Sequence, residues 1–175
     1  MARTMMDSRA MLSSPRLRYE PLGIGHLDRF HSLVQDAHVR RYLMDGEVFP
    51  REWSEERVRD SETLVERRGV GLWLAFDTAS GELAGFCGFL VIPSVHHEPQ
   101  LVYALLERFT GKGFATEMAR ALIEDARANA GFTEIVAGVD EVNAASIRVL
   151  EKLGFKRDQT LRGAFGNTFT YKLAP

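Results

Sequence analysis

The feature that most constrains the fold is the segment of residues 108–117, RFTGKGFATE, which places two glycines and a lysine between an apolar run and a stretch with helical spacing. A strand that ends at such a turn and leads into a helix presents free backbone N–H groups, and the helix dipole adds partial positive charge there. Glycine lets an anion approach the main chain and permits positive φ. The segment therefore predicts an anion-binding loop, or else a plain turn between a strand and a helix.

Two common nucleotide-binding motifs do not fit this segment. No third glycine follows at the spacing of the dinucleotide-binding motif, and neither Ser nor Thr follows Lys112 as in a P-loop. Gly23 and Gly25 have the same spacing as Gly111 and Gly113, and we interpret that earlier pair as an ordinary turn. Nucleotide hydrolysis is thus a weaker hypothesis, and the glycines alone leave the ligand open.

Hydrophobic spacing and turn residues predict the elements around the loop. Strands are expected at residues 17–22, 71–76, 83–92, 99–106, 134–139 and 168–173. Helices are expected at residues 26–43, at 54–68 with Ser54 as N-cap, from the loop to 129–131, and through 147–153. This order mixes a hairpin with strand-helix-strand crossovers, so we predict a mixed α/β fold with helices on both faces of the sheet.

Length and charge limit the organisation and the class of partner. A chain of 175 residues with 45% hydrophobic content predicts one domain at 16–175, preceded by a flexible leader at 1–15 that lacks the apolar run of a secretion signal. A net charge of −2 without a basic face argues against nucleic-acid and membrane surfaces as partners. The single cysteine, Cys87, suits a reducing compartment, so we expect a cytoplasmic protein.

Two stretches carry a resemblance to a known family. Residues 102–117, VYALLERFTGKGFATE, resemble the cofactor-binding motif of the GNAT superfamily of acetyl-CoA-dependent N-acetyltransferases, in which Arg or Gln is followed by two residues, Gly, one residue, and Gly or Ala. Residues 143–155, NAASIRVLEKLGF, are similar to a helix of its ribosomal-protein N-acetyltransferase branch, the RimJ/RimL type. The resemblance spans about 17–173, and its strong motifs lie within 100–155. It implies a strongly twisted mixed sheet whose fourth and fifth strands splay to admit acetyl-CoA.

The resemblance also implies how acetyl-CoA is held. The pantetheine arm would pair with backbone groups of the strand before the loop, the N–H near Leu105 would face the thioester oxygen, and the diphosphate would lie on the loop amides. The implied cofactor-binding residues are Tyr103, Leu105, Leu106, Arg108, Phe109, Thr110, Gly111, Lys112, Gly113, Phe114, Ala115, Thr116 and Asn143. No metal is implied, and His96, His97 and Glu98 lack the further ligands that a metal site needs.

The catalytic groups depart from the usual family pattern. Many members carry a glutamate where this chain has Gln100, and most carry a tyrosine where it has Leu150. Glu98 lies two residues before Gln100, points to the same face of a strand, and is our candidate general base; a solvated carboxylate at the strand start is the alternative. Ser146 is the candidate hydrogen-bond donor to the departing thiolate. Asn143 is equally suited to cap the helix that it precedes.

These observations predict an enzyme that passes the acetyl group of acetyl-CoA directly to a primary amine. A protein N-terminus is a suitable acceptor because an α-amine has a pKa of about 8, against about 10.4 for lysine. A small-molecule amine is an alternative acceptor, and a non-catalytic acyl-CoA-binding module is the alternative function, suggested by Gln100 and Leu150. The oligomeric state is left as monomer or homodimer.

Overall fold

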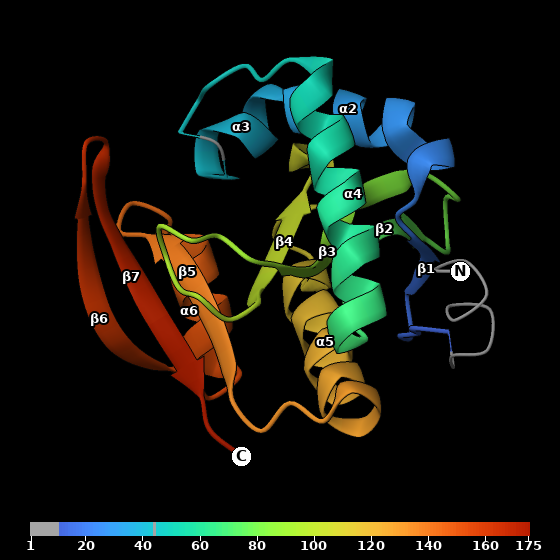
Figure 1. The fold of residues 1–175 in the computed structure, drawn as a ribbon. Helices are drawn as coiled ribbons and strands as arrows, with labels where there is room; N and C mark the ends of the chain where they lie inside the picture. Colours follow the sequence, from blue (N-terminus) through green and yellow to red (C-terminus); the bar gives the residue numbers. More distant parts are fainter. Residues whose placement is uncertain (1–10, 44) are drawn as a thin grey trace.

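The computed structural model describes residues 11–43 and 45–175, in which the strands form one seven-stranded sheet with the order β1-β2-β3-β4-β5-β7-β6 (Figure 1). All neighbouring strands are antiparallel except β4 and β5. The strands are β1 (Leu17–Pro21), β2 (Leu72–Asp77), β3 (Leu83–Leu90), β4 (Gln100–Leu105), β5 (Ile135–Asp140), β6 (Lys156–Gly163) and β7 (Gly166–Leu173). The predicted mixed sheet is confirmed.

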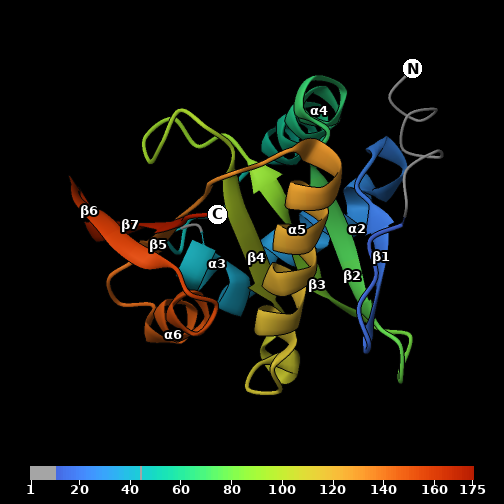
Figure 2. The same cartoon turned by 90° about the horizontal axis from the view of Figure 1, so that it is seen from below.

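Helices cover both faces of this sheet (Figures 1 and 2). Alternate residues of β2 point to opposite faces: Leu72 and Leu74 join a core with α2, whereas Trp73 and Ala75 join a core with α5. The helices are η1 (Ile24–His26), α2 (Leu27–Gln35), α3 (Ala37–Leu43), α4 (Arg51–Arg68), η2 (Glu107–Phe109), α5 (Phe114–Ala130) and α6 (Ala144–Lys152). The predicted helix after the glycine loop is therefore α5, and it ends at left-handed Gly131.

The sheet opens between β4 and β5. β4 pairs with β3 from Gln100 to Leu105, but its parallel pairing with β5 consists of one register pair, Gln100 with Val136. β5 is paired along its whole length with β7 on its other side. The two parallel strands therefore separate toward the glycine loop, as predicted, and Figure 1 shows them diverging.

Two helix boundaries differ from the prediction. The expected helix at 26–43 is interrupted at Asp36, whose extended ψ of 134° ends α2 and whose carboxylate accepts hydrogen bonds from the N–H groups of His38 and Val39. The second helix begins at Arg51, after Pro50, so Ser54 is not its N-cap. Ser54 is buried within α4, and its hydroxyl lies 2.8 Å from Nδ1 of His31.

Strand β6 was absent from the prediction. Its residues are almost all polar and exposed, and it pairs only with β7 at the edge of the sheet, so it lacks the alternation of apolar and polar residues that reveals a half-buried strand. The predicted leader lies partly outside the described residues, which begin at residue 11. Within it, Leu12 is buried and Ser14 donates a hydrogen bond to Glu117 of α5.

Candidate active site

A cavity of about 820 Å³ lies where β4 and β5 separate. Its walls include the two strands, the glycine loop with the first turn of α5, the start of α6, helix α3, and residues around 92–95. Segments more than a hundred residues apart in sequence thus meet at one opening in the sheet. The dimensions suit a ligand of the size that protein pockets usually hold.

The free edge of β4 presents backbone groups to this cavity. The N–H of Leu106 donates to the carbonyl of Ala84 across the β3 side, at 2.9 Å. Because backbone groups alternate in direction along a strand, those of Tyr103 and Leu105 point to the other edge, where no pairing with β5 is formed beyond Gln100. Tyr103 and Leu105 both line the cavity. An extended ligand could pair with this edge as an added strand does.

The glycine loop closes one end of the cavity. Gly111 and Gly113 have φ of 71° and 83°, a region that glycine adopts without the strain met by other residues. Gly113 is the N-cap residue of α5, and no side chain caps the first N–H groups of that helix. A Cβ added at Gly111 would meet no heavy atom within 4 Å, so this side of the loop is open to a ligand. The loop therefore has positive φ at both glycines and a helix start that no side chain caps.

The start of α6 lies across the cavity from β4. Asn143 is the N-cap residue, and its side-chain oxygen accepts a hydrogen bond from the N–H of Ser146 at 3.1 Å. The hydroxyl of Tyr103 donates to the carbonyl of Ser146 at 3.4 Å and so bridges β4 to α6. Burial raises the pKa of Tyr103 to about 12, so this hydroxyl remains a donor well above neutral pH. Both Asn143 and Ser146 line the cavity.

Most of the predicted site residues come together here. Those that line the cavity are Tyr103, Leu105, Thr110, Gly111, Gly113, Phe114, Ala115, Thr116, Asn143 and Ser146. Four predicted cofactor-binding residues have other surroundings. Leu106 turns its N–H toward β3, and Phe109 is buried in the core. The side chain of Arg108 pairs with Glu82 at 3.3 Å, and the ammonium of Lys112 lies 5.5 Å from the ring centre of Phe109.

Glu98 lies outside the residues that line the cavity. β4 begins at Gln100, so Glu98 precedes the strand rather than sharing its face, and that part of the prediction is wrong. Its carboxylate is half-exposed and accepts a hydrogen bond from Arg68 at 2.8 Å. Gln100 is fully buried and holds the preceding segment: it accepts from the N–H of Ile92 at 3.0 Å and donates to the carbonyls of His96 and Glu98.

Sequence reasoning did not single out His38 of α3 or Asp140 at the end of β5. Both face the cavity, as Tyr42 and Asp45 do. Burial raises the pKa of Asp140 and the charge of Asp45 raises it further, whereas a hydrogen bond from Thr168 at 3.0 Å opposes the rise. No local motif marks these residues, since α3 lies some sixty positions before β4 and reaches the site only through the fold.

Within residues 11–43 and 45–175, no three His, Cys, Asp or Glu side chains group closely enough to hold a metal ion. Over the same residues, none of the helices has the length and apolarity to span a bilayer.

Comparison with known proteins identifies similar chains. Residues 16–156 match the family model described as an acetyltransferase (GNAT) domain. The uncharacterized protein YkkB of Bacillus subtilis is 34% identical over 137 residues, which are 76% of this chain and 77% of YkkB. A GNAT-family acetyltransferase from Bordetella pertussis has the same fold, with a TM-score of 0.82 and 22% identity over 95% of this chain and all of that one. RimL, a ribosomal alpha-N-protein acetyltransferase solved with coenzyme A, has a TM-score of 0.78 and 19% identity over 94% of this chain and 98% of its own.

Proposed function

We propose that this chain acetylates the α-amino group of a protein N-terminus. The chain belongs to the GNAT acetyltransferase family and is therefore an N-acetyltransferase that uses acetyl-CoA. The similarity of residues 143–155 to the ribosomal-protein branch supports this acceptor, as does the fold shared with RimL. The lower pKa of an α-amine, about 8, also supports it, because such a group needs less help to become the neutral nucleophile. A purely non-catalytic module is not favoured by membership of this family.

One observation carries the proposed binding of acetyl-CoA: a single cavity joins the free edge of β4, the glycine loop and the start of α6. Each of these three features suits one part of acetyl-CoA, the acetyl donor. The N–H groups at the start of α5 suit the diphosphate, the edge of β4 suits the amides of the pantetheine arm, and Ser146 suits the sulfur. The remaining wall, formed by α3 and residues around 92–95, is left for the acceptor.

The proposed chemistry is direct transfer. The neutral amine attacks the thioester carbonyl carbon, and the N–H of Leu105 stabilises the oxyanion that forms. The carbon–sulfur bond then breaks, the amide is released, and the hydroxyl of Ser146 donates a hydrogen bond to the departing thiolate. Glu98 remains our proposed acceptor of the amine proton. Because its carboxylate lies outside the cavity wall, that proton would travel through water.

Location and assembly belong to the same proposal. We place a single catalytic domain at 16–175 in the cytoplasm, as a monomer or homodimer without nucleic-acid or membrane partners. The net charge of −2 and the free, buried thiol of Cys87 support this assignment.

The acceptor is tested by measuring CoA release with acetyl-CoA held constant and the amine varied. Peptides with free N-termini are expected to give at least tenfold higher kcat/KM than polyamines, amino acids or aminoglycosides. Peptides of the same sequence with a blocked N-terminus and a free lysine serve as controls. Preference for a small amine would replace the proposed acceptor with the small-molecule alternative, while CoA-dependent stabilisation without any turnover would contradict catalysis on these amines.

Ser146→Ala is expected to lower kcat about tenfold at saturating acetyl-CoA, because the thiolate loses a hydrogen-bond donor. The KM for acetyl-CoA should change less than threefold, since Asn143 caps α6 through the backbone N–H of residue 146, which alanine retains. Steady-state kinetics with a peptide acceptor measures both constants. An unchanged kcat would remove Ser146 from the mechanism, and a loss confined to KM would make it a binding residue instead.

A further inference from the structure

We propose that Arg16 is a positioning residue that directs the backbone N–H of Gly113 toward the diphosphate of coenzyme A. Arg16 lies just before β1, outside the cavity wall, almost a hundred residues from the loop that it contacts. The inference rests on the proposed binding of the diphosphate at the glycine loop. It assigns a role to a residue that neither the loop motif nor the cavity identifies.

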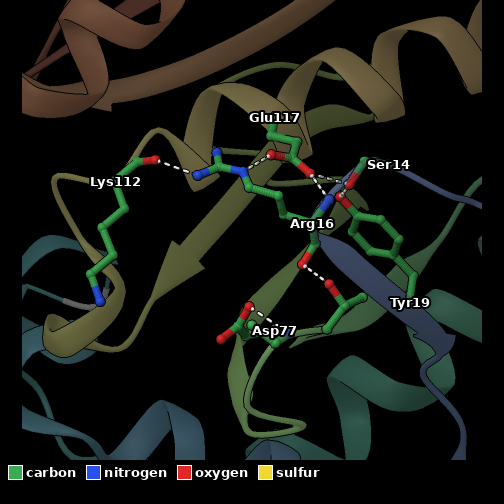
Figure 3. Close-up of polar contacts among 8 residues, drawn as sticks. Ser14, Arg16, Tyr19, Asp77, Lys112 and Glu117 are labelled. Carbon is green, nitrogen blue, oxygen red and sulfur yellow. Dashed lines mark hydrogen bonds and ion pairs between the residues drawn. The ribbon is translucent and has the colours of Figure 1, made fainter.

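Arg16 contacts both the loop and the helix that follows it (Figure 3). Its Nη1 donates to the backbone carbonyl of Lys112 at 2.9 Å. Its Nε and its backbone N–H donate to the two carboxylate oxygens of Glu117, each at 2.8 Å. The guanidinium carbon also lies 4.4 Å from the ring centre of Phe114, the first residue of α5. One side chain thus joins the last loop carbonyl to the first turn of the helix.

The direction of the Gly113 N–H follows from the contact with Lys112. The carbonyl of Lys112 and the N–H of Gly113 belong to one planar trans peptide unit, in which the two groups point to opposite sides. Since the carbonyl is held toward Arg16, the N–H points away from Arg16, and Gly113 lines the cavity while Arg16 does not. The arginine therefore fixes an amide donor on the cavity side without touching the ligand.

The conformational freedom of Gly113 makes the hydrogen bond from Arg16 to the carbonyl of Lys112 important. Gly113 has φ of 83°, and glycine also adopts the mirror-related conformations that would rotate this peptide unit. A rotated unit would present the carbonyl oxygen of Lys112 to the cavity, where it would repel a phosphate instead of binding it. The contact from Arg16 holds the carbonyl on the other side and so favours the orientation that binds an anion.

Arg16 is itself firmly held. Its carbonyl accepts hydrogen bonds from the N–H and the hydroxyl of Thr78, at 3.0 Å and 2.9 Å, which tie it to the hairpin between β2 and β3. Glu117 is only 12% exposed and also accepts a hydrogen bond from Ser14 at 2.7 Å. Burial opposes ionisation of this carboxyl, but the donors from Arg16 and Ser14 hold its pKa below the usual range, so the pair is charged at neutral pH.

The test compares Arg16→Gln with the wild-type chain on three ligands. CoA and dephospho-CoA both carry the diphosphate, whereas pantetheine lacks it; calorimetry measures the first two and NMR titration the third. We expect the Kd of CoA and of dephospho-CoA to rise about tenfold and that of pantetheine to change less than twofold. With acetyl-CoA as donor, KM should rise by the same factor while kcat at saturation stays within twofold.

A matched control lies two residues along the chain. Arg18 has the same stacked arrangement, with its guanidinium carbon 4.4 Å from the ring centre of Phe76, but its ion pair is with Glu20 and it does not contact the loop. Arg18→Gln should leave all three affinities unchanged. Arg16→Lys keeps the charge but lacks the rigid fork in which Nε meets Glu117 while Nη1 meets the carbonyl of Lys112, so it should show most of the effect. It replaces Arg16→Gln if that variant does not fold.

The outcomes separate this inference from the proposed function. Wild-type protein that binds none of the three ligands would overturn the cofactor site itself. Wild-type binding of CoA with unchanged affinity in Arg16→Gln and Arg16→Lys would overturn the role of Arg16 alone. An equal loss for pantetheine and CoA would also overturn it, because general damage to the fold would weaken every ligand alike.

Discussion

Replacing Gly85 of β3 by alanine is expected to lower the free energy of unfolding by about 3 kcal/mol. An added Cβ would lie 1.9 Å from the carbonyl oxygen of Ala104 and 3.0 Å from the Cα of Leu105, so β3 and β4 would have to move apart. Both contacts are backbone atoms, which cannot give way as the end of a flexible side chain can. Urea unfolding followed by circular dichroism measures the change.

Gly25→Ala is the control for Gly85→Ala. No heavy atom lies within 4 Å of a Cβ at Gly25, so this variant should stay within about 0.5 kcal/mol of the wild type. Equal stability of the two variants would show that β3 and β4 can separate freely at this point. Any folded Gly85→Ala protein should also bind CoA more weakly, because Leu105, which pairs with Gly85, presents its N–H to the cavity.

Ala115→Glu is expected to weaken the binding of CoA at least about a hundredfold while leaving the stability of the free protein unchanged or slightly raised. Ala115 lies in the first turn of α5 and lines the cavity. A carboxylate there would occupy the amides that are proposed to bind the diphosphate and would repel it. The same carboxylate interacts favourably with the N-terminal end of the helix dipole, by about 0.3–1 kcal/mol. Calorimetry with CoA and a thermal melt without ligand measure the two effects.

The neutral variant Ala115→Gln separates charge from size. It has nearly the volume of glutamate, so it should weaken the binding of CoA by much less, about tenfold, if repulsion dominates the loss. Equal losses in the two variants would show that bulk alone is responsible. Undiminished binding in Ala115→Glu would place the diphosphate away from the start of α5 and would contradict the proposed arrangement.

The part of the site that sequence predicts is the part encoded by local geometry. Gly111 and Gly113 adopt the positive φ expected of a tight turn before a helix, and Asn143 caps α6 as its spacing before an apolar helix suggests. Turn and cap conformations of this kind are set by a few adjacent residues and depend little on contacts with the rest of the protein. The order of strands and helices follows from periodicity in the same way, which is why the mixed sheet was predicted correctly.

What sequence could not predict depends on contacts between distant segments. β6 is an exposed polar edge strand, and only its pairing with β7 makes it a strand. Asp140 and the wall from α3 reach the cavity through the fold, so spacing gives no hint of them. The face of Glu98 was predicted wrongly because the strand begins only at Gln100, whose buried amide hydrogen-bonds to the backbone of the preceding non-strand segment. An alternating sequence pattern does not reveal such a conformation.

The free edge of β4 has a consequence for how such a protein can change its acceptor. Atoms common to every amino acid are proposed to grip the donor there, since N–H and C=O groups are the same whatever side chain is attached. The side chains of β4, and those of α3 and Asp45 across the cavity, are then not needed to recognise coenzyme A. Mutation of these side chains can therefore adapt the cavity to a new amine without weakening the binding of acetyl-CoA.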